Sequence, residues 1–161
     1  MIFELDQNNE RNTGAAMVPT ITLTEDPDDG ALRDITRLIT QFNEVGSGRP
    51  NDFRALAILL TEPDASETLG GLWGWTSFSF LHIDLLFIPE SMRGAGLGSK
   101  LIYMAEEEAI ERGCRGAWLD TFSFQARGFY EKLGYSLFGS IDDYPPGHSR
   151  FFLRKTFAGR P

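Results

Sequence analysis

Apolar residues in this chain either alternate with polar ones, as in a strand, or recur at helical spacing. The two patterns together predict strands and helices that follow one another along the chain. Residues 20–24 alternate threonine with apolar side chains and predict a first strand. From Ala31 the apolar residues recur at helical spacing, after an acidic turn at 25–30 that is suited to cap a helix. The next apolar runs predict three strands whose simplest pairing is an antiparallel meander, over residues 53–61, 69–79 and 81–88.

The second half of the chain predicts helices that connect strands. Apolar side chains form one stripe of a helix over 97–112, and Gly113 supplies the left-handed residue that ends it. A helix between two strands makes the next strand, 114–121, parallel to its predecessor. A second helix over 123–133 and strands at 135–139 and 150–155 complete the pattern. In the helix over 97–112, Glu108 is placed to pair with Arg112. The glutamates of this helix are predicted to form a solvated outer face: Glu106, Glu107, Glu108 and Glu111.

Glycines occupy alternate positions where strand 81–88 passes into the helix, at Gly94, Gly96 and Gly98. Glycine permits dihedral angles closed to other residues and leaves no side chain between backbone and ligand. The amides of such a turn and of the helix start attract an anion, so a phosphate or pyrophosphate is the expected guest. The spacing fits neither the dinucleotide fingerprint nor the P-loop. An ordinary strand-to-helix turn is the alternative interpretation.

Composition narrows the function further. The formal net charge of −8 argues against a general nucleic-acid binder, which presents a basic face, and is compatible with a cationic amine substrate. The one cysteine, Cys114, allows no disulfide within the chain, and with two histidines it leaves little for a metal site, so we expect no metal.

The length predicts one domain, which we expect over residues 20–158 after a flexible segment at 1–19. The apolar runs are far shorter than a membrane span, and the first 19 residues lack the pattern of a signal peptide. We therefore expect no membrane contact and a cytoplasmic location.

The chain carries two sequence motifs in a fixed order. The first is Arg-x-x-Gly-x-Gly after an apolar strand, at residues 93–98, and the second is Ala-Arg-Gly-Phe-Tyr-Glu-Lys-Leu-Gly-Tyr, at residues 126–135. Together and in this order they resemble the glycine loop and a helix signature of the GNAT family of acyl-CoA-dependent N-acetyltransferases. The resemblance covers residues 53–156, whereas the first third of the chain is only compatible with it.

The resemblance implies an α/β fold of the α+β type: a mixed, mostly antiparallel central sheet with helices on both faces and two central strands that splay apart. The cosubstrate acetyl-CoA would insert at the splay, and the backbone of Leu86, Phe87 and Ile88 would hydrogen-bond its pantetheine arm. Ser123 and Phe129 are further expected contacts, with Ser123 standing where many relatives carry Asn. The pyrophosphate would be held by Arg93, Gly94, Ala95, Gly96, Leu97, Gly98 and Ser99.

The implied reaction moves an acetyl group to a primary amine by direct attack of the amine on the thioester. Tyr130 matches the family's tyrosine near the sulfur and is the expected general acid, with a core tyrosine as the alternative. Asp84 and His82 are candidate bases, because they share side-chain parity on one strand unless a bulge intervenes, and Asp120 is a third option. An amide near Phe87 is the expected oxyanion donor.

Other functions stay open at this point. The chain could be a non-catalytic acyl-CoA sensor, an acyltransferase that uses a different acyl-CoA, or an interaction module with a glycine turn by coincidence. The acceptor could be a small-molecule or peptide amine, and a homodimer is compatible with the sequence. Trp73 and Trp75 share one strand face and could line an acceptor site, although strand aromatics more often pack in a core.

Overall fold

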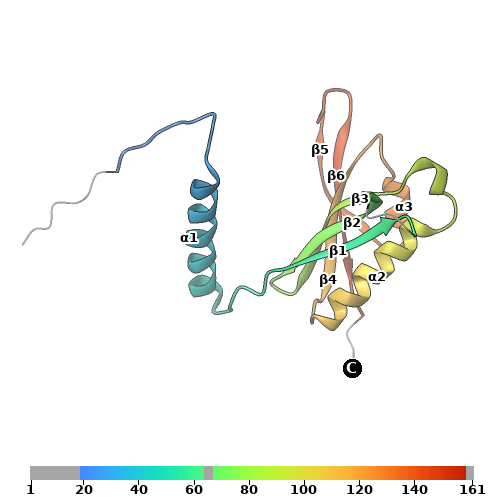
Figure 1. Cartoon of the computed structure of the whole chain (residues 1–161), viewed down its shortest axis with the longest axis horizontal. Helices are drawn as coiled ribbons and strands as arrows, with labels where there is room; N and C mark the ends of the chain where they lie inside the picture. Colours follow the sequence, from blue (N-terminus) through green and yellow to red (C-terminus); the bar gives the residue numbers. More distant parts are fainter. Residues whose placement is uncertain (1–18, 64–66, 159–161) are drawn as a thin grey trace, which may run out of the picture. The chain divides into compact units, whose positions relative to one another are not determined.

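The computed structural model describes residues 19–63 and 67–158. Residues 1–18, most of the segment predicted to be flexible, lie outside the described residues. Residue contacts divide the chain into two units, 1–38 and 39–161, and the boundary falls inside helix α1 (Asp29–Ser47). The second unit carries all the strands (Figure 1).

The N-terminal predictions had mixed outcomes. The predicted strand at 20–24 is wrong, since these residues are not part of any strand. Alternation alone identifies no neighbouring strand to take the backbone hydrogen bonds. The predicted helix and its cap are confirmed, because the Asp28 carboxylate accepts a hydrogen bond of 2.7 Å from the Ala31 amide at the start of α1.

The strands form one six-stranded sheet in the order β1-β2-β3-β4-β6-β5. β3 and β4 are parallel, and every other neighbouring pair is antiparallel, which confirms the predicted mixed sheet and the meander of the first three strands. The bounds are Arg54–Thr61 for β1, Thr68–Ser77 for β2, Phe80–Phe87 for β3, Gly116–Phe122 for β4, Ser136–Asp142 for β5 and Ser149–Thr156 for β6.

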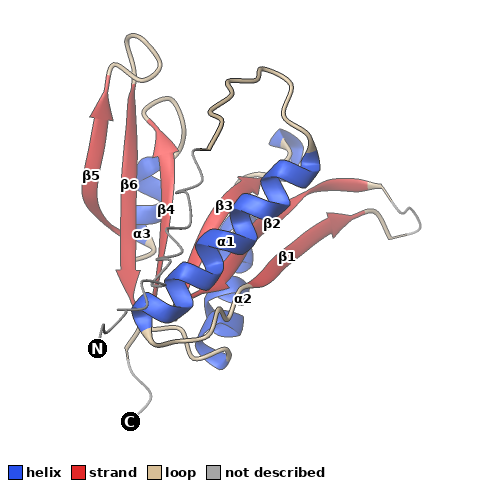
Figure 2. Ribbon diagram, turned by 90° about the vertical axis from the view of Figure 1, so that its left-hand side faces the viewer, coloured by secondary structure: helices blue, strands red, loops and turns tan. Residues whose placement is uncertain are grey.

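Helices α2 (Leu97–Glu111) and α3 (Arg127–Lys132) lie on the same face of this sheet (Figures 1 and 2). A short 3-10 turn, η1 (Glu90–Met92), precedes the glycine loop. The core lies between α2 and the sheet, and the largest side chains that are almost completely removed from solvent are Leu72, Leu81, Ile102, Leu119 and Leu153. None of the helices in the described residues is long and apolar enough to cross a membrane.

The second predicted helix begins four residues later than expected, at Arg127 instead of Ser123. The side chain of Gln125 explains the delay. Its Oε1 accepts hydrogen bonds from the Phe122 amide (2.8 Å) and the Thr121 hydroxyl (3.0 Å). These bonds hold residues 122–125 in a turn, and a side chain bonded to nearby backbone in this way competes with helix formation.

Helix α2 is anchored to the sheet through a glutamate that was predicted to be solvated. Glu106 is buried, and its Oε2 lies 2.6 Å from Nζ of Lys155 on β6, so the prediction of a wholly exposed acidic face is wrong at this position. The helical period leaves Glu106 at the edge of the apolar stripe, where a lysine on the sheet can reach it. The predicted pair of Glu108 and Arg112 is confirmed at 2.7 Å.

Two irregularities open the centre of the sheet. Trp73 pairs with Leu85 and Gly74 pairs with Ile83, so Asp84 is one extra residue on β3 and forms a bulge. The pairing of β3 with β4 stops nearby, at Ile83 and Leu119, although both strands continue. The two central strands therefore separate toward their carboxyl ends, as the resemblance implied.

Candidate active site

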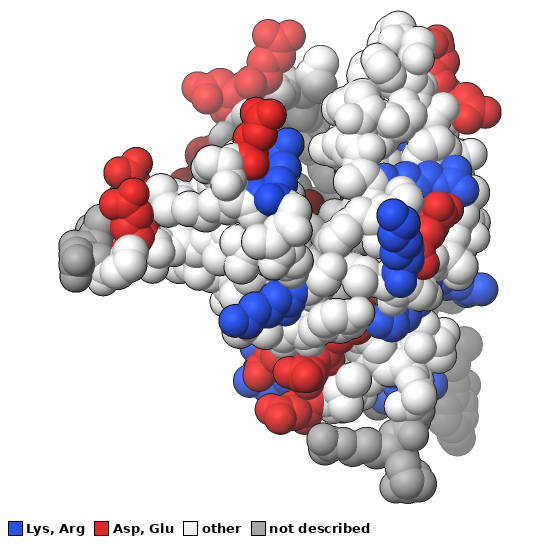
Figure 3. All heavy atoms as spheres, turned by 90° about the vertical axis from the view of Figure 1, so that its right-hand side faces the viewer, with Lys and Arg blue, Asp and Glu red and all other residues white. Residues whose placement is uncertain are grey.

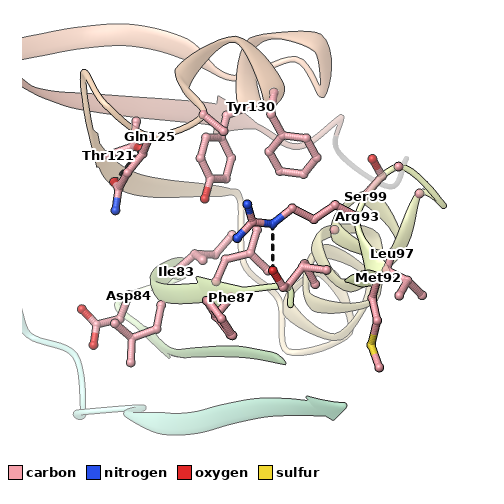
Figure 4. Close-up of a pocket in the computed structure, with 18 of the residues that line it drawn as sticks. Ile83, Asp84, Phe87, Met92, Arg93, Leu97, Ser99, Thr121, Gln125 and Tyr130 are labelled. Carbon is pink, nitrogen blue, oxygen red and sulfur yellow. Dashed lines mark hydrogen bonds between the residues drawn. The ribbon is translucent and has the colours of Figure 1, made fainter. Parts of the chain in front are cut away.

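A cavity of about 860 Å³ lies where β3 and β4 separate. Three segments line it: the end of β3, the glycine loop with the start of α2, and the connection from β4 to α3 (Figure 4). Beyond Ile83, the edge of β3 that faces β4 has no strand partner among the described residues. Unpaired backbone groups at such an edge are free to bond an extended ligand.

The glycine loop has the geometry of an anion site. Gly94 and Gly96 have φ of +83° and +78°, and a Cβ on either would meet no heavy atom within 4 Å. Space therefore lies open above the loop. Among the described residues no side chain caps the first amides of α2, and a helix start leaves these groups without internal partners, so they are available to an anion. Gly98 has a different role, since a Cβ there would lie 3.2 Å from the Phe129 ring.

Arg93 turns back onto the strand that precedes it. Its Nε donates a hydrogen bond of 2.9 Å to the carbonyl of Ile88, and the rest of the guanidinium lies along the cavity (Figure 4). The arginine thus packs on the turn and also presents positive charge to the cavity. On the side of the molecule seen in Figure 3, acidic and basic side chains are interspersed. Attraction for an anion therefore comes from the loop amides and Arg93, and not from a broad basic field.

Tyr130 projects from α3 into the cavity (Figure 4). Burial, and to a smaller extent the nearby carboxylate of Asp120, raise the pKa of its hydroxyl to about 12. Both effects disfavour the phenolate. The hydroxyl keeps its proton at neutral pH and can donate it to a group that develops negative charge.

The two candidate bases have different surroundings. Asp84 is the bulged residue and lines the cavity, whereas His82 is not one of the lining residues. His82 is 7% exposed, its ring lies between those of Trp75 at 4.2 Å and Trp118 at 3.8 Å, and among the described residues neither ring nitrogen has a hydrogen-bond partner. Burial lowers the pKa of His82, although Asp84 and Asp120 partly oppose this.

Asp120 reaches the cavity from β4 and is paired with Arg150 on β6, whose Nε lies 2.6 Å from the carboxylate. The hydrogen bond to Asp120 raises the pKa of Arg150, so the guanidinium keeps its positive charge. Both residues lie where β4 and β6 run side by side, since Phe122 pairs with Arg150 and Asp120 with Phe152.

Most of the predicted site residues meet in this cavity. Tyr130 and Asp84 line it, together with ten predicted cofactor contacts: Leu86, Phe87, Ile88, Arg93, Gly94, Gly96, Leu97, Gly98, Ser99 and Phe129. Ala95 and Ser123 are not among the lining residues. The Ser123 hydroxyl instead accepts a hydrogen bond from the Ser149 amide at 3.2 Å and lies 3.2 Å from Nδ1 of His148.

Sequence reasoning missed several lining residues, including Met92, Thr121, Phe124 and Gln125. A signal for the last three existed. A buried strand that ends in polar residues before a helix commonly carries a binding site, and residues 120–125 are the end of such a strand and the turn after it. Among the described residues, no group of three or more acidic, histidine or cysteine side chains is placed to hold a metal ion.

Comparisons with known proteins agree with this geometry. Residues 33–135 match the profile of the acetyltransferase (GNAT) family. A protein named blasticidin-S acetyltransferase, from Streptomyces morookaense, is 48% identical over 93 residues, which are 57% of this chain and 68% of that protein. An acetyltransferase of Agrobacterium fabrum is 45% identical over 107 residues, 66% of this chain and 77% of its own length. The crystal structure of an acetyltransferase from Bacillus cereus is 33% identical and covers 84% of this chain and 98% of its own, with a TM-score of 0.72.

Proposed function

Because the chain belongs to the GNAT acetyltransferase family, we propose that it transfers an acetyl group from acetyl-CoA to the primary amine of a small molecule. The observation that carries this proposal is the cavity between the separated ends of β3 and β4, with its glycine loop and Tyr130. An aminoglycoside 6′-N-acetyltransferase with this fold, 17% identical and with a TM-score of 0.58, was solved with coenzyme A.

The residues present fit acetyl-CoA. The open loop of Gly94 and Gly96, the first amides of α2 and the guanidinium of Arg93 suit a pyrophosphate. The free edge of β3 at Leu86–Ile88 suits the amides of an extended pantetheine arm, which would add to it like a strand. When bound, acetyl-CoA supplies the activated acetyl group as a thioester.

The chain's own groups supply the proton transfers. Tyr130 acts as general acid toward the leaving thiolate, since its raised pKa keeps the proton available. Asp84 is the better supported base, because it lines the cavity while His82 does not. A backbone amide near Phe87 would donate to the developing oxyanion.

The acceptor is a small cationic amine. The carboxylate of Asp84 lines the cavity and attracts an ammonium group, whereas that of Asp120 is already paired with Arg150. The similarity to a protein named for acetylation of the antibiotic blasticidin S supports a small molecule as acceptor.

The first test is thermal melting with and without acetyl-CoA, for the wild type and Gly96→Glu. A ligand that binds only the native state raises the melting temperature. We expect a rise in the wild type and none in Gly96→Glu, whose side chain would fill the open space above the loop. An amine screen with detection of free thiol then measures turnover.

Gly113→Glu is the matched control. Gly113 has φ of +82° and open space around its missing side chain, as Gly96 does, but it follows α2 and does not line the cavity. Both variants carry the same backbone strain and charge. A response to acetyl-CoA that survives in Gly113→Glu and disappears in Gly96→Glu supports the site. Absence of any response in folded wild type refutes the proposed function.

A further inference from the structure

An aromatic cluster lies beside the cavity at the carboxyl end of β4. Phe122 and Phe124 stack with their ring centroids 5.1 Å apart and their planes 5° from parallel. Tyr144, from the loop between β5 and β6, meets Phe122 edge-on at 6.0 Å. We call these three residues the aromatic shelf. Phe124 also lines the cavity, so the shelf continues the wall of the proposed active site.

The shelf is exposed although its side chains are large and apolar. Phe124 is 57% exposed and Tyr144 is 46% exposed. Leaving such rings in water forgoes the free energy that their burial would contribute, and an exposed apolar patch next to a cavity is typical of a binding surface. The ring faces are therefore available to a ligand that enters the cavity.

The shelf is also held in place by its neighbours. Ser123, between the two phenylalanines, donates its amide to the Ser149 carbonyl at 2.8 Å and accepts from the Ser149 amide at its hydroxyl. His148 meets the Phe124 ring edge-on at 4.9 Å, and the Tyr144 amide donates to the His148 carbonyl at 2.9 Å. The two loops thus fix each other, and a ligand need not order them on binding.

A positively charged side chain, Arg150, already lies against two rings of the aromatic shelf. The guanidinium of Arg150 lies 5.1 Å from the centroid of Phe122 and 5.8 Å from that of Tyr144, and it is paired with Asp120. The guanidinium thus already makes with Phe122 and Tyr144 the cation–π contact that an ammonium group of an acceptor could make. A second cation placed beside it would meet a like charge, so a flat, uncharged ring fits the exposed faces of Phe124 and Tyr144 better than an ammonium group does.

We propose that the aromatic shelf binds a planar conjugated ring of the acceptor, so that the preferred acceptors are primary amines joined through a short aliphatic linker to an aromatic or heteroaromatic ring. This inference rests on the proposed function. The ring lies on Phe124 and Tyr144, and the amine extends toward Asp84 and Tyr130 in the cavity. Purely aliphatic amines reach the same cavity without this contact.

The test compares two amines that differ only in the ring, 2-phenylethylamine and 2-cyclohexylethylamine, by their kcat/KM with the full chain. Stacking on an aromatic side chain favours the phenyl compound by about tenfold in kcat/KM. Phe124→Leu and Tyr144→Leu should each reduce the preference to about twofold or less. Phe138→Leu is the control, because Phe138 is 52% exposed on β5 but its ring packs beside Phe152, outside the aromatic shelf, and it should keep the preference.

Saturation-transfer NMR with the CoA-bound protein gives the same comparison for binding, where turnover is slow. Equal kcat/KM, or equal affinities for the two amines, overturn the inference. A rise in KM for acetyl-CoA in Phe124→Leu, with the preference kept, assigns the shelf to the cosubstrate and also overturns it. If wild type does not bind acetyl-CoA, the proposed function fails. If it binds acetyl-CoA and acetylates both amines equally, only the inference fails.

Discussion

At the scale of single residues, Tyr130 has surroundings that suit a general acid. Replacing it with phenylalanine removes the proton donor and keeps the ring that packs beside Phe129. We expect Tyr130→Phe to lower kcat by about a hundredfold or more, with little change in KM for acetyl-CoA. Because the pKa of Tyr130 is about 12, wild-type kcat should show no decline from this group between pH 7 and 10.

Steady-state kinetics by thiol release check both statements. Tyr135→Phe is the control, since the Tyr135 ring lies 6.2 Å from that of Tyr130 but does not line the cavity. It should keep kcat near the wild-type value. Full activity in Tyr130→Phe would assign the tyrosine to the core alone.

At the scale of elements, the close approach of β2 and β3 beside the bulge at Asp84 requires a glycine on β2. Gly74 on β2 lies so close to the His82 carbonyl that an added Cβ would overlap it. We expect Gly74→Ala to lower the free energy of unfolding by ~2 kcal/mol or more, because the β2–β3 backbones must separate.

Urea denaturation measures this change, with Gly139→Ala as the matched control. Gly139 is also a strand glycine, but its added Cβ would meet Phe152 at an ordinary distance of 3.9 Å. Its free energy of unfolding should change by less than ~1 kcal/mol. Equal effects of the two substitutions would show that close approach of β2 and β3 does not decide the stability.

At the scale of the whole molecule, overall stability should depend on pH through His82. Burial lowers its pKa from 6.5, so below that pH an unfolded chain takes up a proton that the folded chain resists. The contribution of His82 is therefore complete above pH 6.5, and the free energy of unfolding falls as the pH drops below it. The slope from this group is at most ~1.4 kcal/mol per pH unit.

Urea denaturation between pH 8 and 5 tests this dependence. His82→Phe should flatten the curve, because it removes the group whose protonation differs between the two states. His148→Gln changes an exposed histidine and should leave the slope unchanged. A slope that is the same in His82→Phe and wild type would contradict the assignment.

The amino-acid sequence was sufficient to predict those structural features that depend on local residue patterns. The meander, the glycine loop, helix α2 and its stop at Gly113 follow from periods and turn residues that act within a few positions. The cavity-lining residues of the loop were found for the same reason, since an anion site at a helix start is built from consecutive residues.

What the sequence could not predict depends on partners far along the chain. The burial of Glu106 requires Lys155, 49 residues later, and the register shift at Asp84 requires the spacing of β2. The aromatic shelf joins Phe122 and Phe124 to Tyr144, which one sequence does not place together. The predicted strand at 20–24 was wrong because alternation describes a strand's faces but not its neighbour.

The short pairing of β3 with β4 has a mechanical consequence. Four residue pairs join the half of the sheet made of β1, β2 and β3 to the half made of β4, β6 and β5. Because so few backbone pairs connect the two halves of the sheet, a force that pulls them apart would act mainly on those four pairs. Acetyl-CoA bound as proposed would contact both halves of the sheet beyond the last paired residues and hold the two halves together. In the proposed reaction, release of coenzyme A would remove this link between the two halves, and binding of the next acetyl-CoA would restore it.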